Sequence, residues 1–328
     1  MNILNTPLRL HGLELKNRIV LPPISVYQAR DGYMTDKLLH CYAEKSRGGY
    51  PALILTAHLY VAPAGMAKPN QTSVADDRCL PGLAALAACI RSNGCKSMAQ
   101  ISHAGSAARG TELPLLGPSA VENPAFPGVL PQEMTAAQIE QTVADFAAAA
   151  ARVQKAGFDG VEIHMAHGYL LNQFYSPLTN RRTDAYTGQT LPGRLRLPLA
   201  VVRAVRAAVG PDYSIALRFA AADYLPGGTT LAESLIAARE LEQAGVDLFD
   251  VSGGMCRFDR PGHPEEGYFA ELTQGLKQVL TAPVNLTGGI RSQAAAQRFL
   301  RDGVADLIGV GRAALADPAA TVRALLAE

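Results

Sequence analysis

Two histidines and a tyrosine stand close together in the stretch EIHMAHGYLLNQFYSPLTNRRTDAYTG, residues 162–188. His164 and His167 are three positions apart, and Tyr169 comes two positions later, directly behind an apolar run typical of a buried strand. Three kinds of chemistry fit: a metal site, a pair of structural histidines, or a hydrogen-bonding clamp with a proton donor beside it. A zinc site needs three or four ligands, and only Glu162 stands near the pair, so no metal is expected.

Two glycine-rich stretches near the end of the sequence could bind phosphate. GVGRAA, residues 309–314, fits the G-x-G-x-x-A pattern of dinucleotide-binding folds, which also require an acidic residue about 20 positions further on. The printed sequence stops at Glu328 and leaves no room for that residue. In a parallel barrel, however, turns after the last two strands bind phosphate, and TGGI at 287–290 supplies the second turn. Glycines that serve the tight turns alone remain the alternative.

The elements that must position these residues alternate along the chain. Short aliphatic or β-branched runs predict strands, and alanine- and leucine-rich segments with helical spacing separate them. The predicted strands are residues 18–24, 52–57, 97–102, 158–164, 214–219, 246–252, 283–288 and 305–311. The clearest predicted helices are residues 135–156, 194–209, 230–244 and 292–302. Eight strands, several of them preceded by a helix that stops at glycine, predict an α/β fold of the (β/α)8 TIM-barrel type rather than an open doubly wound sheet.

We expect a single domain over residues 1–328, with additions to the barrel. A hairpin near the amino terminus is expected to cap it. The proline- and glycine-rich stretch 104–134, after the third strand, is expected to form a lid over the mouth. The loop at 253–267, after the sixth strand, is a second candidate cover, and passive surface loops are the alternative for both stretches.

Chemistry in such a barrel belongs at the carboxyl ends of the strands. The sequence places there the run Pro22–Tyr27 together with Gln100, His103, His164, His167 and Arg218. A glutamine amide both donates and accepts, and an arginine holds an electron-rich atom, so the two side chains suit the edge of a planar heterocycle. With a phosphate at the last two strands, this arrangement predicts a mononucleotide lying across the mouth.

The composition excludes several function classes. The sequence has 328 residues, of which 48% are hydrophobic and 18% charged, and its formal net charge is +1, so neither nucleic acid nor an anionic membrane is an expected partner. Five cysteines without a C-x-x-C pair predict free thiols rather than disulfides or an iron–sulfur site. Neither a signal peptide nor a run of ~18 apolar residues is present, so we expect a cytoplasmic protein with a small-molecule substrate. A homo-oligomer remains open.

Three stretches together make the sequence similar to the Old Yellow Enzyme family of FMN-dependent NAD(P)H:flavin oxidoreductases, in its bacterial branch. They are LKNRIVLPPIS, HMAHGYLLNQFYSPLTNRRTDAYTG and DLIGVGRAALADP, which begin at residues 15, 164 and 306. The resemblance implies FMN as cofactor and NAD(P)H as transient reductant. It implies contacts to the flavin ring from Pro23, Ile24, Ser25, Ala57, Gln100 and Arg218, and to the phosphate from Gly288, Gly289, Gly311 and Arg312. Ser25 stands where the family usually has threonine or cysteine, which leaves the flavin potential open.

The same resemblance implies a role for the first cluster. His164 and His167 would clamp the carbonyl or nitro oxygen of an activated alkene, and Tyr169 would protonate its carbon. Tyr27 would bring a second hydroxyl to the substrate oxygen. Hydride from NAD(P)H would pass through the flavin to the double bond in a ping-pong sequence. An FMN dehydrogenase that oxidises an amine or alicyclic substrate, and a flavin-binding protein without turnover, remain alternatives.

Overall fold

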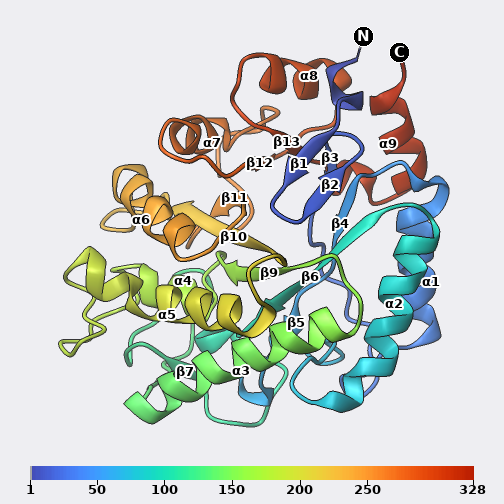
Figure 1. The fold of residues 1–328 in the computed structure, drawn as a ribbon. Coiled ribbons are helices and arrows are strands. Elements are labelled where there is room, and N and C mark those ends of the chain that lie inside the picture. Colours follow the sequence, from blue (N-terminus) through green and yellow to red (C-terminus); the bar gives the residue numbers. More distant parts are fainter. Residues whose placement is uncertain (1) are drawn as a thin grey trace.

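The structure is a computed structural model that describes residues 2–328. Its centre is a closed ring of eight parallel strands: β3 (Ile19–Leu21), β4 (Leu53–Leu55), β6 (Lys96–Ser102), β9 (Gly160–Met165), β10 (Ser214–Ala222), β11 (Leu248–Gly253), β12 (Val284–Thr287) and β13 (Leu307–Gly309). Strand β4 pairs with β3 on one side and with β6 on the other, which closes the ring (Figure 1). The predicted (β/α)8 TIM barrel is therefore confirmed, and each of the eight predicted strands is present.

Helices surround the ring on its outer side (Figure 1). They are α1 (Asp36–Ser46), α2 (Leu80–Ser92), α3 (Ala136–Lys155), α4 (Leu170–Tyr175), α5 (Leu191–Val209), α6 (Leu231–Gln243), α7 (Ala270–Lys277), α8 (Gln293–Arg301) and α9 (Pro318–Leu326). Capping boxes begin two of them, because Thr135 with Gln138 and Thr230 with Glu233 satisfy the free N–H groups of α3 and α6. Within residues 2–328, no helix has both the length and the apolar character that a membrane span requires.

Glycine stops three of these helices just before a strand. Gly157, Gly245 and Gly303 follow α3, α6 and α8, and their φ angles of +87°, +118° and +67° lie where residues with a Cβ are rarely found. In each case the chain reverses and enters the next barrel strand within a few residues. The unit of helix, glycine and strand predicted from the sequence is therefore confirmed at these three places in the barrel.

A hairpin closes the amino-terminal end of the barrel. Strands β1 (Leu8–Leu10) and β2 (Leu13–Leu15) pair antiparallel around Gly12, and their leucines pack against strand residues such as Leu53, Met98 and Leu248 inside the ring. The hydroxyl of Ser214, the first residue of β10, donates to the backbone carbonyl of the hairpin's His11. The expected hairpin cap is therefore present, and it leaves the carboxyl end of the barrel for a ligand.

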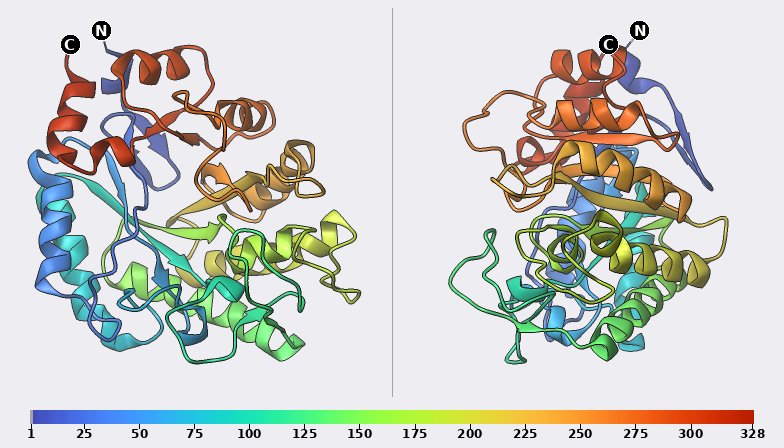
Figure 2. Two further views of the ribbon diagram at one scale, coloured as in Figure 1. Left: turned by 180° about the vertical axis from the view of Figure 1, so that it is seen from behind. Right: turned by 90° about the vertical axis from the view of Figure 1, so that its left-hand side faces the viewer.

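The 104–134 segment lies between β6 and α3 and contains short elements of its own. A 3-10 turn spans Gly105–Ala107, and the two-residue strands β7 (Leu116–Gly117) and β8 (Gln132–Glu133) pair in parallel. In the right-hand view of Figure 2 the segment projects from one side of the molecule, and the hairpin lies on the opposite side. The segment therefore extends from the open end of the barrel, where the sequence predicts the functional site.

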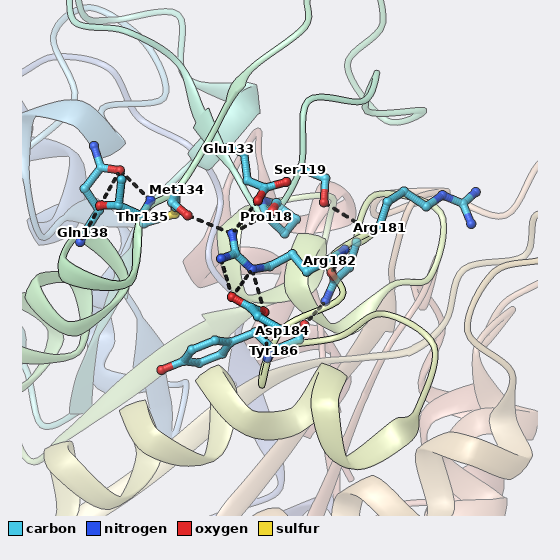
Figure 3. A network of polar contacts seen from close by, with 11 residues as sticks. Pro118, Ser119, Glu133, Met134, Thr135, Gln138, Arg181, Arg182, Asp184 and Tyr186 are labelled. Carbon is cyan, nitrogen blue, oxygen red and sulfur yellow. Dashed lines mark hydrogen bonds and ion pairs between the residues drawn. The ribbon is translucent and has the colours of Figure 1, made fainter.

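Arg182 fastens the middle and the carboxyl end of this segment to the rest of the molecule (Figure 3). The side chain is buried, and its Nη1 donates to the carbonyls of Pro118 and Met134 at 3.1 Å and 2.7 Å. Its Nη2 lies 2.6 Å from a carboxylate oxygen of Asp184, and Glu133 is a second ionic partner at 3.4 Å. One guanidinium thus satisfies two carbonyls beside β7 and β8 while its charge is balanced.

Replacing Arg182 by methionine should loosen the 104–134 segment and leave the barrel folded, because the Pro118 and Met134 carbonyls lose their donor. Hydrogen bonds to a charged group contribute about 1.5–3 kcal/mol each, so limited proteolysis within the segment should become at least ~10-fold faster. Arg181→Met, at the exposed neighbouring position, is the matched control and should be cleaved at the wild-type rate. Equal rates in the two variants would mean that Arg182 does not fasten the segment.

Candidate active site

A layer of polar side chains fills the barrel directly above the apolar layer that meets the hairpin. It consists of Gln100 (β6), Glu162 (β9), Arg218 (β10), Asp250 (β11) and Asn285 (β12), all buried. Inward-facing positions recur every two residues along a strand. Arg218 therefore lies two residues after Ala216, and Asp250 two residues after Leu248, which both belong to the apolar layer. Gln100 Nε2 donates to Glu162 at 2.7 Å, Asn285 Nδ2 donates to Asp250 at 2.7 Å, and Arg218 forms an ion pair with Asp250.

The charges of this layer balance. Arg218 and Asp250 neutralise each other, and burial, followed by the Asp250 carboxylate, raises the pKa of Glu162 well above its usual value. Burial therefore favours the protonated, uncharged form of Glu162. Nη1 of Arg218 is committed to Asp250, whereas no hydrogen bond within residues 2–328 involves its Nη2 or Oε1 of Gln100. Nε of Arg218, Oε1 of Glu162 and Oδ1 of Asn285 also have no partner among the described residues, so the layer offers free donors and free acceptors to a ligand lying above it.

His164, near the end of β9, presents one free nitrogen. Its Nδ1 accepts the backbone N–H of Ala166 at 3.2 Å, so the neutral ring carries its proton on Nε2. Burial, followed by the nearby His58 and Arg218, lowers the pKa of His164 well below its usual value, which keeps the ring neutral near pH 7. Nothing in residues 2–328 accepts from Nε2. The ring is therefore an uncharged donor without a protein partner.

His167 offers its free nitrogen from a strained backbone. Its φ of +60° lies in the left-handed region, where such residues cost about 1–3 kcal/mol and cluster at functional sites. Its Nε2 is 2.7 Å from the hydroxyl of Ser252. This hydroxyl has no other acceptor among the described residues. Both groups are satisfied when Ser252 donates to Nε2, which leaves the His167 proton on Nδ1. Burial, followed by the neighbouring His164, lowers the pKa of His167 as well.

Tyr169 precedes the first residue of α4 and stacks on the ring of His164, with centroids 4.8 Å apart. On another side it meets Phe126 of the 104–134 segment at 5.9 Å. Burial, followed by Tyr27, raises the pKa of Tyr169, so its hydroxyl keeps its proton over the ordinary pH range. The structure therefore brings together His164, His167, Tyr169 and Tyr27, as the sequence predicts.

His58 belongs to the same cluster, and sequence reasoning missed it. Its ring centroid lies 5.4 Å from that of Tyr169, 6.1 Å from that of His164 and 6.0 Å from that of Tyr27. His58 directly follows Ala57 at the carboxyl end of β4. The rule that selected the other mouth residues, a polar residue at the carboxyl end of a barrel strand, would have found it.

Backbone N–H groups of the two glycine turns after β12 and β13 are free to bind an anion. None of the N–H groups of Gly289, Gly311 and Arg312 has a hydrogen-bond partner within residues 2–328. Gly289 has a φ of +69°, and a Cβ there would lie 3.0 Å from the ring of Tyr268. The exposed side chain of Arg312 donates to the Tyr268 hydroxyl at 2.8 Å, so a cation stands beside the turns. Free N–H groups and a cation suit a phosphate.

The helix terminus next to these turns is already occupied by a carboxylate. Glu266 Oε2 accepts the backbone N–H groups of Arg291 and Ser292 at 2.8 Å and 2.9 Å, just before α8 begins. An acidic side chain thus sits where the helix dipole favours an anion. A phosphate would therefore bind at the glycine turns, and the amino-terminal end of α8 would not take part in binding it.

The remaining predicted contacts lie at the ends of β3 and β4. Pro23 and Ile24 are half-buried, and Ser25 is exposed. Ala57 donates its backbone N–H to the Tyr42 hydroxyl at 2.6 Å. The Ala57 carbonyl accepts the Thr56 hydroxyl at 3.1 Å, so among the backbone groups of Ala57 only the second lone pair of this oxygen is left for a polar contact to the ring.

A purely structural role, which was the alternative for His164 and His167, fits His103 instead. His103 Nδ1 accepts the backbone N–H of Gly105 at 3.0 Å, and its ring packs so closely on Gly65 that a Cβ there would be 2.6 Å away. Its position therefore stabilises the start of the 104–134 segment. Within residues 2–328, no three His, Cys, Asp or Glu side chains are arranged to hold a metal ion.

Known proteins resemble this chain over nearly its whole length. The profile of the NADH:flavin oxidoreductase / NADH oxidase family matches residues 4–325. A metal reductase of Desulforamulus reducens is 39% identical over 97% of the chain, and an NADPH dehydrogenase of Bacillus licheniformis is 38% identical over 95% of it. The chain spans 91% of that NADPH dehydrogenase but only 48% of the metal reductase and of an NADH oxidase of Thermoanaerobacter brockii.

Solved structures agree with the barrel. A 2-naphthoyl-CoA reductase with 2-naphthoyl-CoA bound superposes with a TM-score of 0.90 at 26% identity, over 97% of this chain and 51% of that one. Morphinone reductase gives a TM-score of 0.86 at 25% identity, over 99% of this chain and 90% of that one. An old yellow enzyme homologue from Zymomonas mobilis gives 0.85 at 25% identity, over 98% and 91%.

Acid should destabilise the protein through its buried histidines. Burial lowers the pKa of His58 and of His103 from 6.5 to about 4. The unfolded chain therefore binds more protons below pH 6.5, and the stability that is complete above this pH is lost as the pH falls towards 4. Each histidine should account for roughly 3 kcal/mol, since one pKa unit corresponds to about 1.4 kcal/mol.

Denaturant titrations across this pH range should show a slope that His58→Gln reduces. His40→Gln, at an exposed position of α1, is the matched control. A slope that is as steep in His58→Gln as in the wild type would contradict the burial of His58 as a neutral ring.

Proposed function

The chain belongs to the NADH:flavin oxidoreductase / NADH oxidase family, and from this premise we propose that it is an NAD(P)H-dependent FMN oxidoreductase that reduces an activated carbon–carbon double bond. The observation that carries the proposal is the pair of uncommitted donors, Nε2 of His164 and Nδ1 of His167, beside the Tyr169 hydroxyl. Binding a flavin needs none of these three groups, whereas reduction of an alkene uses all of them. The names NADPH dehydrogenase and morphinone reductase among similar proteins support the same reaction class.

The residues around the mouth fit FMN. Nη2 of Arg218 and Oε1 of Gln100 offer a free donor and a free acceptor to the edge of its ring. The N–H groups of Gly289 and Gly311, with the Arg312 cation, suit its phosphate. When bound, FMN supplies to the substrate the hydride that it has received from NAD(P)H.

The two histidines would hold the substrate by its oxygen. A carbonyl placed beside Nε2 of His164 and Nδ1 of His167 accepts a hydrogen bond from each ring. Negative charge grows on this oxygen as the double bond is reduced, and donors fixed in place beforehand stabilise it more than they stabilise the ground state. Both rings are neutral because burial lowers their pKa values. They therefore donate hydrogen bonds to the substrate oxygen but transfer no proton to it.

Tyr169 would supply the proton that completes the reduction. The burial that raises its pKa keeps the hydroxyl protonated, and the ring stacked on His164 holds it beside the clamped oxygen. A carbanion-like carbon next to the carbonyl is basic enough to take a proton from such a phenol. The histidines and Tyr169 therefore have separate tasks, because charge and proton arrive at different atoms.

We propose that the 104–134 segment covers the mouth as a lid. Its Phe126 packs beside Tyr169, and the guanidinium of Arg257 in the 253–267 loop lies 4.7 Å from the Phe126 ring. These contacts connect the two loops above the cluster. Water excluded from the closed mouth would no longer compete for the donors, which strengthens their hydrogen bonds to the substrate.

Both reactants would use this pocket in turn, which makes the kinetics ping-pong. The carboxamide oxygen of a nicotinamide and the carbonyl oxygen of an alkene are both acceptors, and His164 and His167 suit either one.

Tyr169→Phe should separate the two half-reactions. Phenylalanine keeps the ring and its stacking but has no proton to give, so reduction of bound FMN by NADPH should stay near normal. Re-oxidation by 2-cyclohexenone should slow about 100-fold or more, the usual worth of general acid catalysis. Stopped-flow absorbance of the flavin measures both steps. Tyr50→Phe, just before β4 at the closed end of the barrel, is the matched control.

His164→Ala should instead weaken both steps, because the nicotinamide and the alkene use the same clamp. Loss of one donor to a developing charge lowers the rate of alkene reduction by about 100-fold. If Tyr169→Phe slowed both half-reactions equally, Tyr169 would not be the proton donor. If wild-type protein held FMN but no alkene re-oxidised it, a flavin-binding protein without turnover would be the better description.

A further inference from the structure

The third histidine of the cluster, His58, has a hydrogen-bond pattern that fixes where its proton lies. The ring is buried among Tyr27, His164 and Tyr169, and the reaction described above gives it no task. Its Nδ1 is 2.8 Å from Nε2 of Gln71, and its Nε2 is 3.3 Å from the Tyr27 hydroxyl. The partner on each side of the ring therefore decides whether His58 donates to Tyr27 or accepts from it.

Gln71 settles the first side. Its Oε1 accepts the backbone N–H of Ala67 at 2.7 Å, and a backbone N–H can only donate, so the amide cannot be turned the other way. The Nε2 end therefore faces His58, where it donates to Nδ1 and, at 3.0 Å, to the His58 carbonyl. Because an amide nitrogen does not accept, Nδ1 of His58 must be the acceptor and carries no proton.

The hydroxyl of Ser102, 3.1 Å from Nδ1, agrees with this assignment. It can donate either to Nδ1 or to the Leu59 carbonyl at 3.4 Å, and neither choice needs a proton on Nδ1. Burial lowers the pKa of His58 to about 4, so the ring is neutral near pH 7 and has one proton. With Nδ1 accepting, that proton is on Nε2, the atom that faces Tyr27.

We propose that Gln71 and His58 are positioning residues that turn the hydroxyl proton of Tyr27 into the pocket. The Tyr27 oxygen accepts from His58 Nε2, so its own proton points away from His58, into the pocket that Tyr169 also lines. This inference rests on the proposed function and deepens it, because Tyr27 then joins His164 and His167 as a third donor. Three donors that converge on one place favour a substrate whose polar group there accepts hydrogen bonds: a carbonyl, nitro, carboxylate or imide oxygen.

The proton position can be measured without any turnover. Long-range proton–nitrogen NMR of the FMN-loaded protein with 15N-labelled histidine distinguishes the two neutral forms, and His58→Gln identifies the signal of His58. We expect the Nε2–H form. A signal of the Nδ1–H form or of a charged ring would overturn the inference, whatever the enzyme reduces. Failure of the proposed function would leave this result unchanged.

Gln71→Glu tests the consequence for Tyr27. A carboxylate accepts both the Ala67 N–H and a proton on Nδ1, so at about pH 8.5 the neutral His58 ring should switch to the Nδ1–H form. His58 Nε2 then accepts the Tyr27 proton and withdraws it from the pocket. We expect kcat/KM for 2-cyclohexenone to fall about tenfold or more, and tenfold is the low end of what a hydrogen bond to a charged group contributes. Tyr27→Phe should cost about the same.

The double variant separates positioning from a general structural role. If Gln71 acts through Tyr27, adding Gln71→Glu to Tyr27→Phe should cost nothing further. Multiplied losses, about a hundredfold in the double variant, would show that Gln71 supports the pocket by another route and would overturn the proposal. Should Gln71→Glu fail to fold, the NMR measurement on wild-type protein still decides the position of the proton.

Discussion

The buried ion pair of Arg218 and Asp250 is the interaction on which the mouth of the barrel depends. The register of β10 and β11 sets the two residues side by side, one step above the aliphatic layer that the hairpin seals. Removing either partner would leave an unbalanced charge in the interior, at a cost of about 3–5 kcal/mol. Arg218 is therefore held with Nη1 committed and with Nε and Nη2 free among the described residues, so the barrel can offer fixed donors to a ligand above it.

The same lack of water decides the protonation of the groups around that cation. Burial is the first cause of the lowered pKa values of His58, His164 and His167 and of the raised value of Tyr169, so all four are uncharged near pH 7. In a neutral imidazole the neighbour of one nitrogen determines the role of the other. The Ala166 N–H orients His164, the Ser252 hydroxyl orients His167, and the Gln71 amide orients His58, so groups outside the pocket set the direction of the donors in it.

Local patterns predicted much of this architecture. Glycine after a helix and a short aliphatic run identified the strands, and the rule that chemistry lies at the carboxyl ends of strands brought His164, His167 and Tyr169 to one place. Asp250 was missed although it alternates with Leu248, an inward leucine of the same strand, because a strand buried on both sides has no polar face to mark the alternation. Gln71, Phe126 and Arg182 could not be found in this way, since their partners are chosen by loops whose path the sequence does not specify. The roles of the site residues stay predictions.

The most direct measurement is anaerobic and uses the wild-type protein. The flavin is reduced with one equivalent of NADPH and then mixed with increasing 2-cyclohexenone while its absorbance is followed. The oxidised spectrum should return at a rate that saturates with the enone, cyclohexanone should form in equal amount to the flavin, and the flavin released on denaturation should be FMN. A reduced flavin that persists with the enone and re-oxidises only when oxygen is admitted would contradict the proposed reduction of a double bond.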